Sequence, residues 1–248
     1  MSEARVRRRG IYLLPNLFTT GCLFCGFYAI TEALNGRYET AALLVFTAMV
    51  MDGLDGRVAR LTHTQTAFGA EYDSLSDMVS FGLSPALVMY LWSLSSLSKL
   101  GWFAAFVYAA GAALRLARFN TQIGVEDKRY FQGLPSPSAA AVVVGLIWLS
   151  ETYGLTGEAM RYVAALVTIL AALLMVSNIR YYSFKEVDIR GRVPFVVIIV
   201  VMLVFAVVFT NPQLMLFVIF SGYAVSGPFM TLILLQRHRS RKRRRPHS

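Results

Sequence analysis

Apolar residues along the chain gather into eight long stretches that are separated by shorter polar connections. A helix needs about 20 residues to cross a hydrocarbon core of about 30 Å, and the stretches approach that length. The pattern therefore predicts an all-α polytopic membrane protein with about eight transmembrane helices. The stretches cover residues 12 to 34, 39 to 60, 69 to 94, 99 to 119, 137 to 152, 160 to 178, 194 to 210 and 213 to 236.

The composition agrees with a membrane location. Of the 248 residues, 56% are apolar and only 15% are charged, whereas soluble domains average about 45 to 50% and about 25%. Neither a linker nor an internal repeat divides the chain. We expect one transmembrane domain over residues 1 to 236, followed by a disordered basic tail over residues 237 to 248.

The basic residues are distributed unevenly between the connections, and the formal net charge is +10. If both termini lie in the cytoplasm, that side holds 21 of the 24 Lys and Arg residues, and only Arg37, Lys99 and Arg161 lie opposite. Cytoplasmic connections of membrane proteins carry this excess. We therefore expect an integral protein of a bacterial-type cytoplasmic membrane, with both termini and the active site on the cytoplasmic side. We expect membrane lipids, and no nucleic acid, around the basic ends.

Cys22 and Cys25 form a CxxC pair, but both lie inside the first stretch and no second pair exists. A buried free cysteine behaves as a small hydrophobic residue. We assign no chemistry to this pair.

Four aspartates stand inside or at the edge of predicted spans, where a carboxylate is costly. Asp52 and Asp55 lie near the end of the second stretch, and Asp73 and Asp77 lie near the start of the third. Spacings of three and four residues put each pair on one face of its helix. Because a short connection joins the two helices, we expect the two acidic faces to confront each other.

Four facing carboxylates would repel one another, and two divalent cations would balance their formal charge. An all-carboxylate set favours Mg²⁺ or Mn²⁺ over zinc or copper. Two such ions, about 3.5 to 4 Å apart, can clamp a diphosphate during phosphoryl substitution. The same residues also allow a helix junction paired with Arg57 and Arg60, or a proton path.

Small residues recur beside the second stretch's acids, at Gly53, Gly56 and Ala59. Such residues occur where helices pack closely or where a ligand approaches the backbone. Arg60 follows at the membrane edge, where a guanidinium suits phosphate oxygens.

Together these residues spell D-x2-D-G-x2-A-R-x8-G-x3-D-x3-D, which resembles the signature of the CDP-alcohol phosphatidyltransferase family. The resemblance implies a helical membrane enzyme, usually homodimeric, in which a hydroxyl displaces CMP from a CDP-linked lipid. It implies metal binding by Asp52, Asp55 and Asp73, with Asp77 at the metals and acting as general base. It also implies a CDP pocket shaped by Gly56, Ala59, Arg60 and Gly69.

A second resemblance concerns the acceptor. The segments "LPNLFTTGCLFCGF", "RLARFN" and "GLPSP" look like the phosphatidylserine synthase branch of the family. This resemblance implies CDP-diacylglycerol as donor and L-serine as acceptor. Because no Ser-His or Cys-His arrangement competes, we expect direct in-line attack rather than a covalent enzyme intermediate. Glycerol 3-phosphate, inositol phosphate or choline as acceptor, and ion or proton transport as a different function, remain alternatives.

Polar residues near the same end of the predicted spans are candidates for binding the acceptor or a phosphate. Arg115 and Arg118 are three residues apart at the end of the fourth stretch, and guanidiniums there need anionic partners or reach the headgroups. We expect Arg118 to contribute more than Arg115. Asn16, Asn120 and Ser136 either orient polar groups of the substrate or satisfy the backbone at helix ends.

Overall fold

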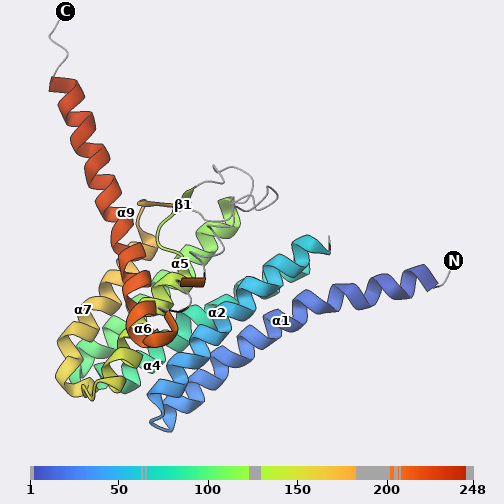
Figure 1. The fold of residues 1–248 in the computed structure, drawn as a ribbon, viewed down its shortest axis with the longest axis horizontal. Helices are drawn as coiled ribbons and strands as arrows, with labels where there is room; N and C mark the ends of the chain where they lie inside the picture. Colours follow the sequence, from blue (N-terminus) through green and yellow to red (C-terminus); the bar gives the residue numbers. More distant parts are fainter. Residues whose placement is uncertain are drawn as a thin grey trace, which may run out of the picture.

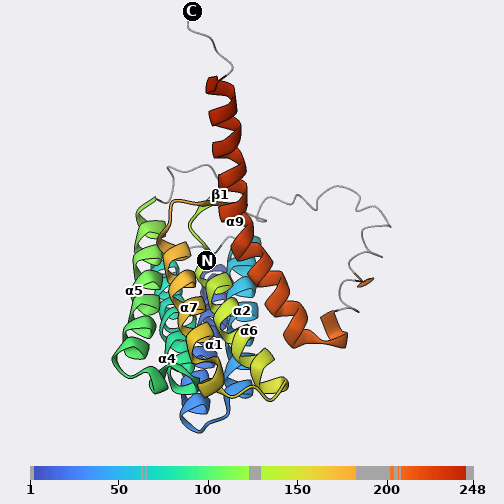
Figure 2. The ribbon, with the colours of Figure 1, turned by 90° about the vertical axis from the view of Figure 1, so that its left-hand side faces the viewer.

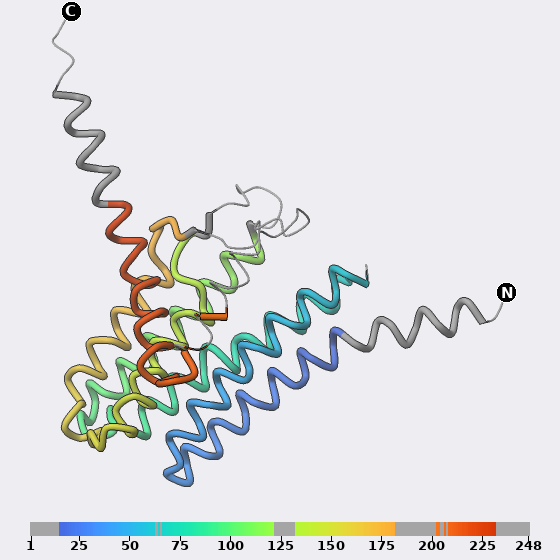
Figure 3. The backbone as a smooth tube through the Cα atoms, in the orientation of Figure 1, coloured from blue at the N-terminus to red at the C-terminus, as the bar shows by residue number. Residues whose placement is uncertain are grey.

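The protein is a bundle of helices that lie mostly along one direction (Figures 1 and 3). The computed structural model describes residues 3–62, 64, 66–122, 130–182, 202–203, 206 and 208–243. Within these ranges, side chains are described at all residues except 3–14, 122, 130–131, 182 and 232–243.

The first two helices, α1 (Glu3–Leu34) and α2 (Tyr38–Leu61), form an antiparallel hairpin. Gly36 turns the chain with a φ of +74°, a conformation that glycine adopts without strain. Arg37 at the turn donates to both carboxylate oxygens of the buried Glu32, at 2.6 and 2.8 Å. The hairpin is therefore closed at the end opposite the aspartates.

The third predicted stretch is a composite helix. It consists of α3 (Ala67–Asp77), a π-helical turn at Met78–Leu83 and α4 (Ser84–Trp92). Thr66 caps α3, because its hydroxyl accepts a hydrogen bond from the Gly69 amide at 2.9 Å. The π-helical turn begins directly after Asp77, and such turns are frequent at functional sites.

A short 3-10 helix at Leu94–Leu97 follows, and the other α-helices of the described residues are α5 (Lys99–Gln122), α6 (Ser136–Thr152), α7 (Gly157–Val176) and α9 (Pro212–Arg243). Helix α6 is buried over most of its length and packs against α2, α4, α7 and α9 (Figure 2). Its small Ala, Val, Ser and Gly side chains allow this close approach on all sides.

A two-stranded ribbon covers the end of the bundle where α5 and α7 finish (Figure 1). Strands β1 (Tyr130–Gln132) and β2 (Arg180–Tyr182) pair antiparallel, with Phe131 opposite Tyr181. The Tyr181 hydroxyl donates to the Ala224 carbonyl of α9 at 2.9 Å. The ribbon thus ties the connection before α6 to the end of α7 and to α9.

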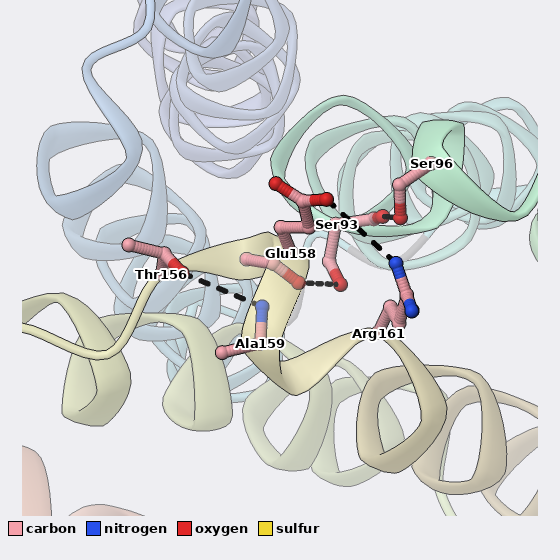
Figure 4. A network of polar contacts seen from close by, with 7 residues as sticks. Ser93, Ser96, Thr156, Glu158, Ala159 and Arg161 are labelled. Atoms are coloured by element: carbon pink, nitrogen blue, oxygen red, sulfur yellow. Dashed lines mark hydrogen bonds and ion pairs between the residues drawn. The ribbon is translucent and has the colours of Figure 1, made fainter.

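The opposite end of α7 is held by a small polar network (Figure 4). The Ser93 hydroxyl donates to the Gly157 carbonyl at 2.6 Å, and the Thr156 hydroxyl accepts from the Ala159 amide at 3.4 Å. Glu158 and Arg161 are 3.7 Å apart on the exposed side. These contacts cap the helix and involve none of the candidate site residues.

Seven of the eight predicted stretches coincide with described helices, so the all-α membrane fold is confirmed. Within the described residues, five helices are long and apolar enough to span a membrane, while α6 has 17 residues and α2 carries charged residues in its last third. The predicted seventh span lies outside the described residues except for 202, 203, 206 and 208–210. The count of eight therefore stays a prediction.

Two further expectations concern the C-terminal limit of the domain and the two cysteines. Helix α9 continues to Arg243, so the predicted domain limit at residue 236 falls within a helix, and residues 244–248 of the predicted tail lie outside the described residues. Cys22 and Cys25 are free thiols buried in the core.

Candidate active site

Three of the four predicted acids come together between α2 and α3. One carboxylate oxygen from each of Asp52, Asp55 and Asp73 lies within 4.8 Å of the other two. Asp55 is buried, and the other two are half-buried. The spacing of the acids along two neighbouring helices therefore produces the confrontation that the sequence predicts.

Asp77 stands one helical turn beyond Asp73 and is not part of that set of three. Its Oδ1 atom is buried and has no hydrogen-bond partner among the described residues. The charges of Asp52, Asp73 and Arg115 all act on this carboxylate. A buried polar atom without a partner is costly, so Asp77 has an oxygen available for a ligand or a proton.

The small residues of the motif differ in what surrounds them. A Cβ atom at Gly56 would meet nothing within 4 Å, so this position borders open space rather than a packed helix. Gly69 lies against Asn16, whose Oδ1 would be 3.5 Å from a Cβ atom there. Ala59 is half-buried. The Arg60 side chain is exposed, and its Nε donates to the Gly56 carbonyl at 2.9 Å.

Arg115 is near enough to the acids for its charge to act on them. Its Nη1 atom donates to the hydroxyl of the fully buried Ser136 at 2.6 Å. Its Nε atom is buried and has no hydrogen-bond partner among the described residues. The guanidinium interacts electrostatically with Asp77 and Asp52. Arg115 is therefore a cation beside the acidic cluster with a donor still available.

The Arg118 side chain binds the chain that follows α7 instead. Its Nη1 atom donates to Asn178 Oδ1 at 3.2 Å and to the Ser177 carbonyl at 3.4 Å, both just past the end of α7. Asn120 binds Ser74 of α3 through its amide nitrogen at 3.0 Å. The structure thus connects Arg118 to the chain after α7 and Asn120 to α3, whereas the charge of Arg115 acts on Asp77 and Asp52.

Thr19 is a site residue that sequence reasoning missed. Its hydroxyl, on α1, donates to Asp55 Oδ2 at 2.8 Å. A threonine inside a helix ordinarily bonds the carbonyl four residues earlier, and Thr19 also lies 3.1 Å from the Pro15 carbonyl. The sequence offers no signal that separates these two partners.

The donor set suits a hard divalent cation. Carboxylate oxygens are the ligands that such ions prefer, and three of them already converge. Within the described residues the buried Asp77 Oδ1 adds an unpartnered oxygen. The residues present therefore fit the divalent metal that the motif implies.

Comparison with known proteins agrees with the motif. The sequence profile described as CDP-alcohol phosphatidyltransferase matches residues 12–177. A CDP-diacylglycerol-serine O-phosphatidyltransferase of Helicobacter pylori is 36% identical over 91% of this chain and 93% of its own length. Proteins of the same name from Mycobacterium tuberculosis and Bacillus subtilis are 34% and 33% identical, over 90% and 70% of this chain and 80% and 92% of theirs. The chain belongs to the CDP-alcohol phosphatidyltransferase family.

Proposed function

We propose that the protein transfers the phosphatidyl group of CDP-diacylglycerol to the hydroxyl of L-serine and releases CMP. The observation that carries this proposal is the convergence of Asp52, Asp55 and Asp73 beside Asp77 and Arg115. The relatives named above, which carry the serine enzyme's name, support the choice of acceptor.

Asp52, Asp55 and Asp73, together with Asp77, would hold two divalent cations, Mg²⁺ or Mn²⁺. When bound, such ions neutralise a diphosphate and stabilise charge that develops during phosphoryl substitution. The buried position of Asp55 and the half-buried positions of its partners keep these carboxylates partly out of water, which strengthens their electrostatic interactions.

Asp77 is proposed as the general base. Its unpartnered Oδ1 can accept the proton of the serine hydroxyl as the serine oxygen forms a bond to the phosphatidyl phosphorus. The bond from that phosphorus to the CMP oxygen breaks, and CMP leaves. Among the described residues this oxygen has no hydrogen-bond partner, so proton transfer to it breaks no existing hydrogen bond.

Arg115 is proposed to hold the anionic end of the acceptor or the lipid phosphate. A guanidinium that already donates one N–H to Ser136 is fixed in direction, and its buried Nε still has a donor to offer. Arg118 would contribute indirectly, because its Nη1 contacts hold the chain after α7. This ranking reverses the expectation from sequence, and it rests on the different neighbours of the two side chains.

The CDP moiety is proposed to lie along the exposed side of α2, where Gly56 leaves open space and Arg60 projects from the helix end. Ala59 and Gly69 would border the same pocket. Asn16 and Asn120 would line its polar edge. Small side chains are needed here because a phosphate must approach the backbone closely.

The protein is an integral membrane protein. We propose that both termini and the active site face the cytoplasm, because 21 of 24 Lys and Arg residues then lie on that side. The family resemblance also supports a homodimer, with CDP-diacylglycerol and L-serine as substrates.

The proposal is tested with purified protein, CDP-diacylglycerol, Mn²⁺ or Mg²⁺, and separate reactions with L-serine, glycerol 3-phosphate, inositol phosphate and choline. CMP release and the lipid product are measured by chromatography and mass spectrometry. We expect a metal-dependent phosphatidylserine product with serine alone. A product with another acceptor only would reject serine and keep the family reaction, whereas no CMP release with any acceptor would reject the proposed function.

A further inference from the structure

One residue of helix α1, Thr19, is hydrogen-bonded to both acid-bearing helices. The Thr19 hydroxyl donates to Asp55 Oδ2 of α2 at 2.8 Å. The Thr19 carbonyl accepts a hydrogen bond from the Ser76 hydroxyl of α3 at 3.0 Å. Thr19 is 3% exposed and Ser76 is 1% exposed, so neither bond competes with bulk water.

The bond to Asp55 restricts how that carboxylate can turn. A carboxylate has two oxygens with two lone pairs each. When one lone pair of Oδ2 accepts the Thr19 proton, rotation of the carboxylate is restricted and the remaining lone pairs cover a narrower range of directions. A hydrogen bond to a charged acceptor is also about twice as strong as a neutral one.

The bond from Ser76 fixes the other helix. Ser76 lies between Asp73 and Asp77 in the sequence of the third span, so its anchor sets the height of both acids relative to α1. One turn further, the Ser80 hydroxyl donates to the Cys22 carbonyl at 3.0 Å. A Cβ atom at Gly26 would lie 2.5 Å from the Ser80 hydroxyl, so the two segments touch there without room for a side chain.

We propose that Thr19 is a positioning residue that orients Asp55 and aligns α3 so that the acidic cluster is arranged before a divalent cation binds. This inference rests on the metal site of the proposed function. Partners that orient metal ligands affect affinity although they do not touch the ion. Thr19 would act in this way from a helix that contributes none of the four acids.

Thr168 offers a matched control. It is fully buried on α7, and its hydroxyl donates to the Ala164 carbonyl at 2.7 Å, the same helix-internal bond that Thr19 can make to Pro15. This hydroxyl bonds a backbone carbonyl of its own helix and none of the four acids in the described part of the chain. Thr168→Val therefore removes a buried helical hydroxyl without touching the cluster.

The experiment measures Mn²⁺ binding to the full chain in detergent, without substrate, by the electron paramagnetic resonance signal of free Mn²⁺. Thr19→Val keeps the shape and removes the hydroxyl, and we expect its affinity to fall about 10- to 100-fold. Thr19→Ser restores the donor and should bind as the wild type does, as should Thr168→Val. In activity assays the Thr19→Val enzyme should need more Mn²⁺ for half-maximal rate, with an unchanged KM for serine at saturating metal.

The possible results distinguish failure of the Thr19 inference from failure of the proposed metal site. If Thr19→Val binds Mn²⁺ as tightly as the wild type, or if Thr19→Ser is as weak as Thr19→Val, the hydroxyl does not position Asp55 and the inference fails while the proposed function stands. If the wild type does not bind Mn²⁺, the metal part of the proposed function fails and the inference fails with it. If the Thr19→Val protein does not fold, the same binding measurement is made with Thr19→Ala, which also removes the hydroxyl.

Discussion

Arg115 donates from Nη1 to the hydroxyl of Ser136 at 2.6 Å, which joins the last third of α5 to the first residue of α6. Ser136 is fully buried, so the bond holds the guanidinium in place. The remaining Nε–H of Arg115 is buried without a hydrogen-bond partner in the described part of the chain. An arginine held in this way is ready to bind an anion at little further entropic cost.

Replacing Arg115 by Lys keeps the positive charge and removes the planar fork. We expect kcat/KM for serine to fall about 10- to 150-fold. This corresponds to a loss of about 1.5 to 3 kcal/mol of transition-state stabilisation, which is the value of one charge-assisted hydrogen bond. Arg118→Lys should have a smaller effect, because the Arg118 contacts given by the structure are to Asn178 and Ser177. Steady-state kinetics of both variants measure the difference. A larger loss for Arg118→Lys would restore the ranking expected from sequence.

Asp77→Asn should abolish turnover and leave CDP-diacylglycerol binding largely intact. The amide keeps the size of the side chain but cannot take a proton from the serine hydroxyl. Turnover is measured by CMP release, and lipid binding by calorimetry in detergent. Retained turnover would remove Asp77 from the role of general base.

The three clustered acids should behave differently from Asp77. Asp52→Asn, Asp55→Asn and Asp73→Asn each remove one charged ligand from a set whose oxygens lie within 4.8 Å of one another. We expect weaker Mn²⁺ binding and weaker nucleotide binding together. Calorimetric titration of each variant with Mn²⁺, followed by CDP-diacylglycerol, checks this. Unchanged Mn²⁺ affinity in all three would show that the cluster does not bind the metal.

The acidic cluster was predictable because its geometry is local. Spacings of three and four residues fix which acids share a helix face. Because the connection between α2 and α3 is short, the two acidic faces must lie close to each other. The long helices were predictable for a similar reason, since a membrane span requires a continuous apolar stretch. Both predictions depend on residues that are close in sequence.

What the sequence could not supply depends on contacts between distant segments. Arg115 and Arg118 share one helix end, and only the packing of α5 against α6 and α7 decides that Arg115 meets Ser136 while Arg118 meets Asn178. The π-helical turn after Asp77 has its Phe81 carbonyl bound by the hydroxyl of Tyr108 on α5, at 3.1 Å. Neither contact can be predicted from a pattern of neighbouring residues in the sequence.

The orientation of the protein in the membrane can be tested independently of its activity. Ser2→Cys and Ser248→Cys each place a thiol near one end of the chain, in a background where Cys22 and Cys25 are replaced by Ala. Because basic residues concentrate on the cytoplasmic side, we expect an impermeant maleimide to label neither end in intact cells and both after lysis. Labelling of one end from outside would mean an odd number of spans.

One glycine of the ribbon and one glycine of the α1–α2 turn have nearly the same backbone conformation. Gly133 has a φ of +76° and follows β1, and Gly36 has a φ of +74° at the α1–α2 turn. A Cβ atom at Gly36 would meet nothing within 4 Å, whereas one at Gly133 would collide with the Met175 carbonyl oxygen at 2.2 Å. Gly36→Ala should therefore cost only the backbone strain of about 1 kcal/mol.

Gly133→Ala should cost more than that strain, because the Gly133 amide also donates to the Ile179 carbonyl at 2.8 Å and the collision would push β1 away from β2. We expect a lower Tm than for Gly36→Ala, together with reduced turnover, since the ribbon is continuous with Ser177 and Asn178, which bind Arg118. Thermal unfolding in detergent and CMP release measure the two effects. Equal losses of Tm in both variants would mean that the backbone relaxes around Gly133 and that the ribbon does not depend on this contact.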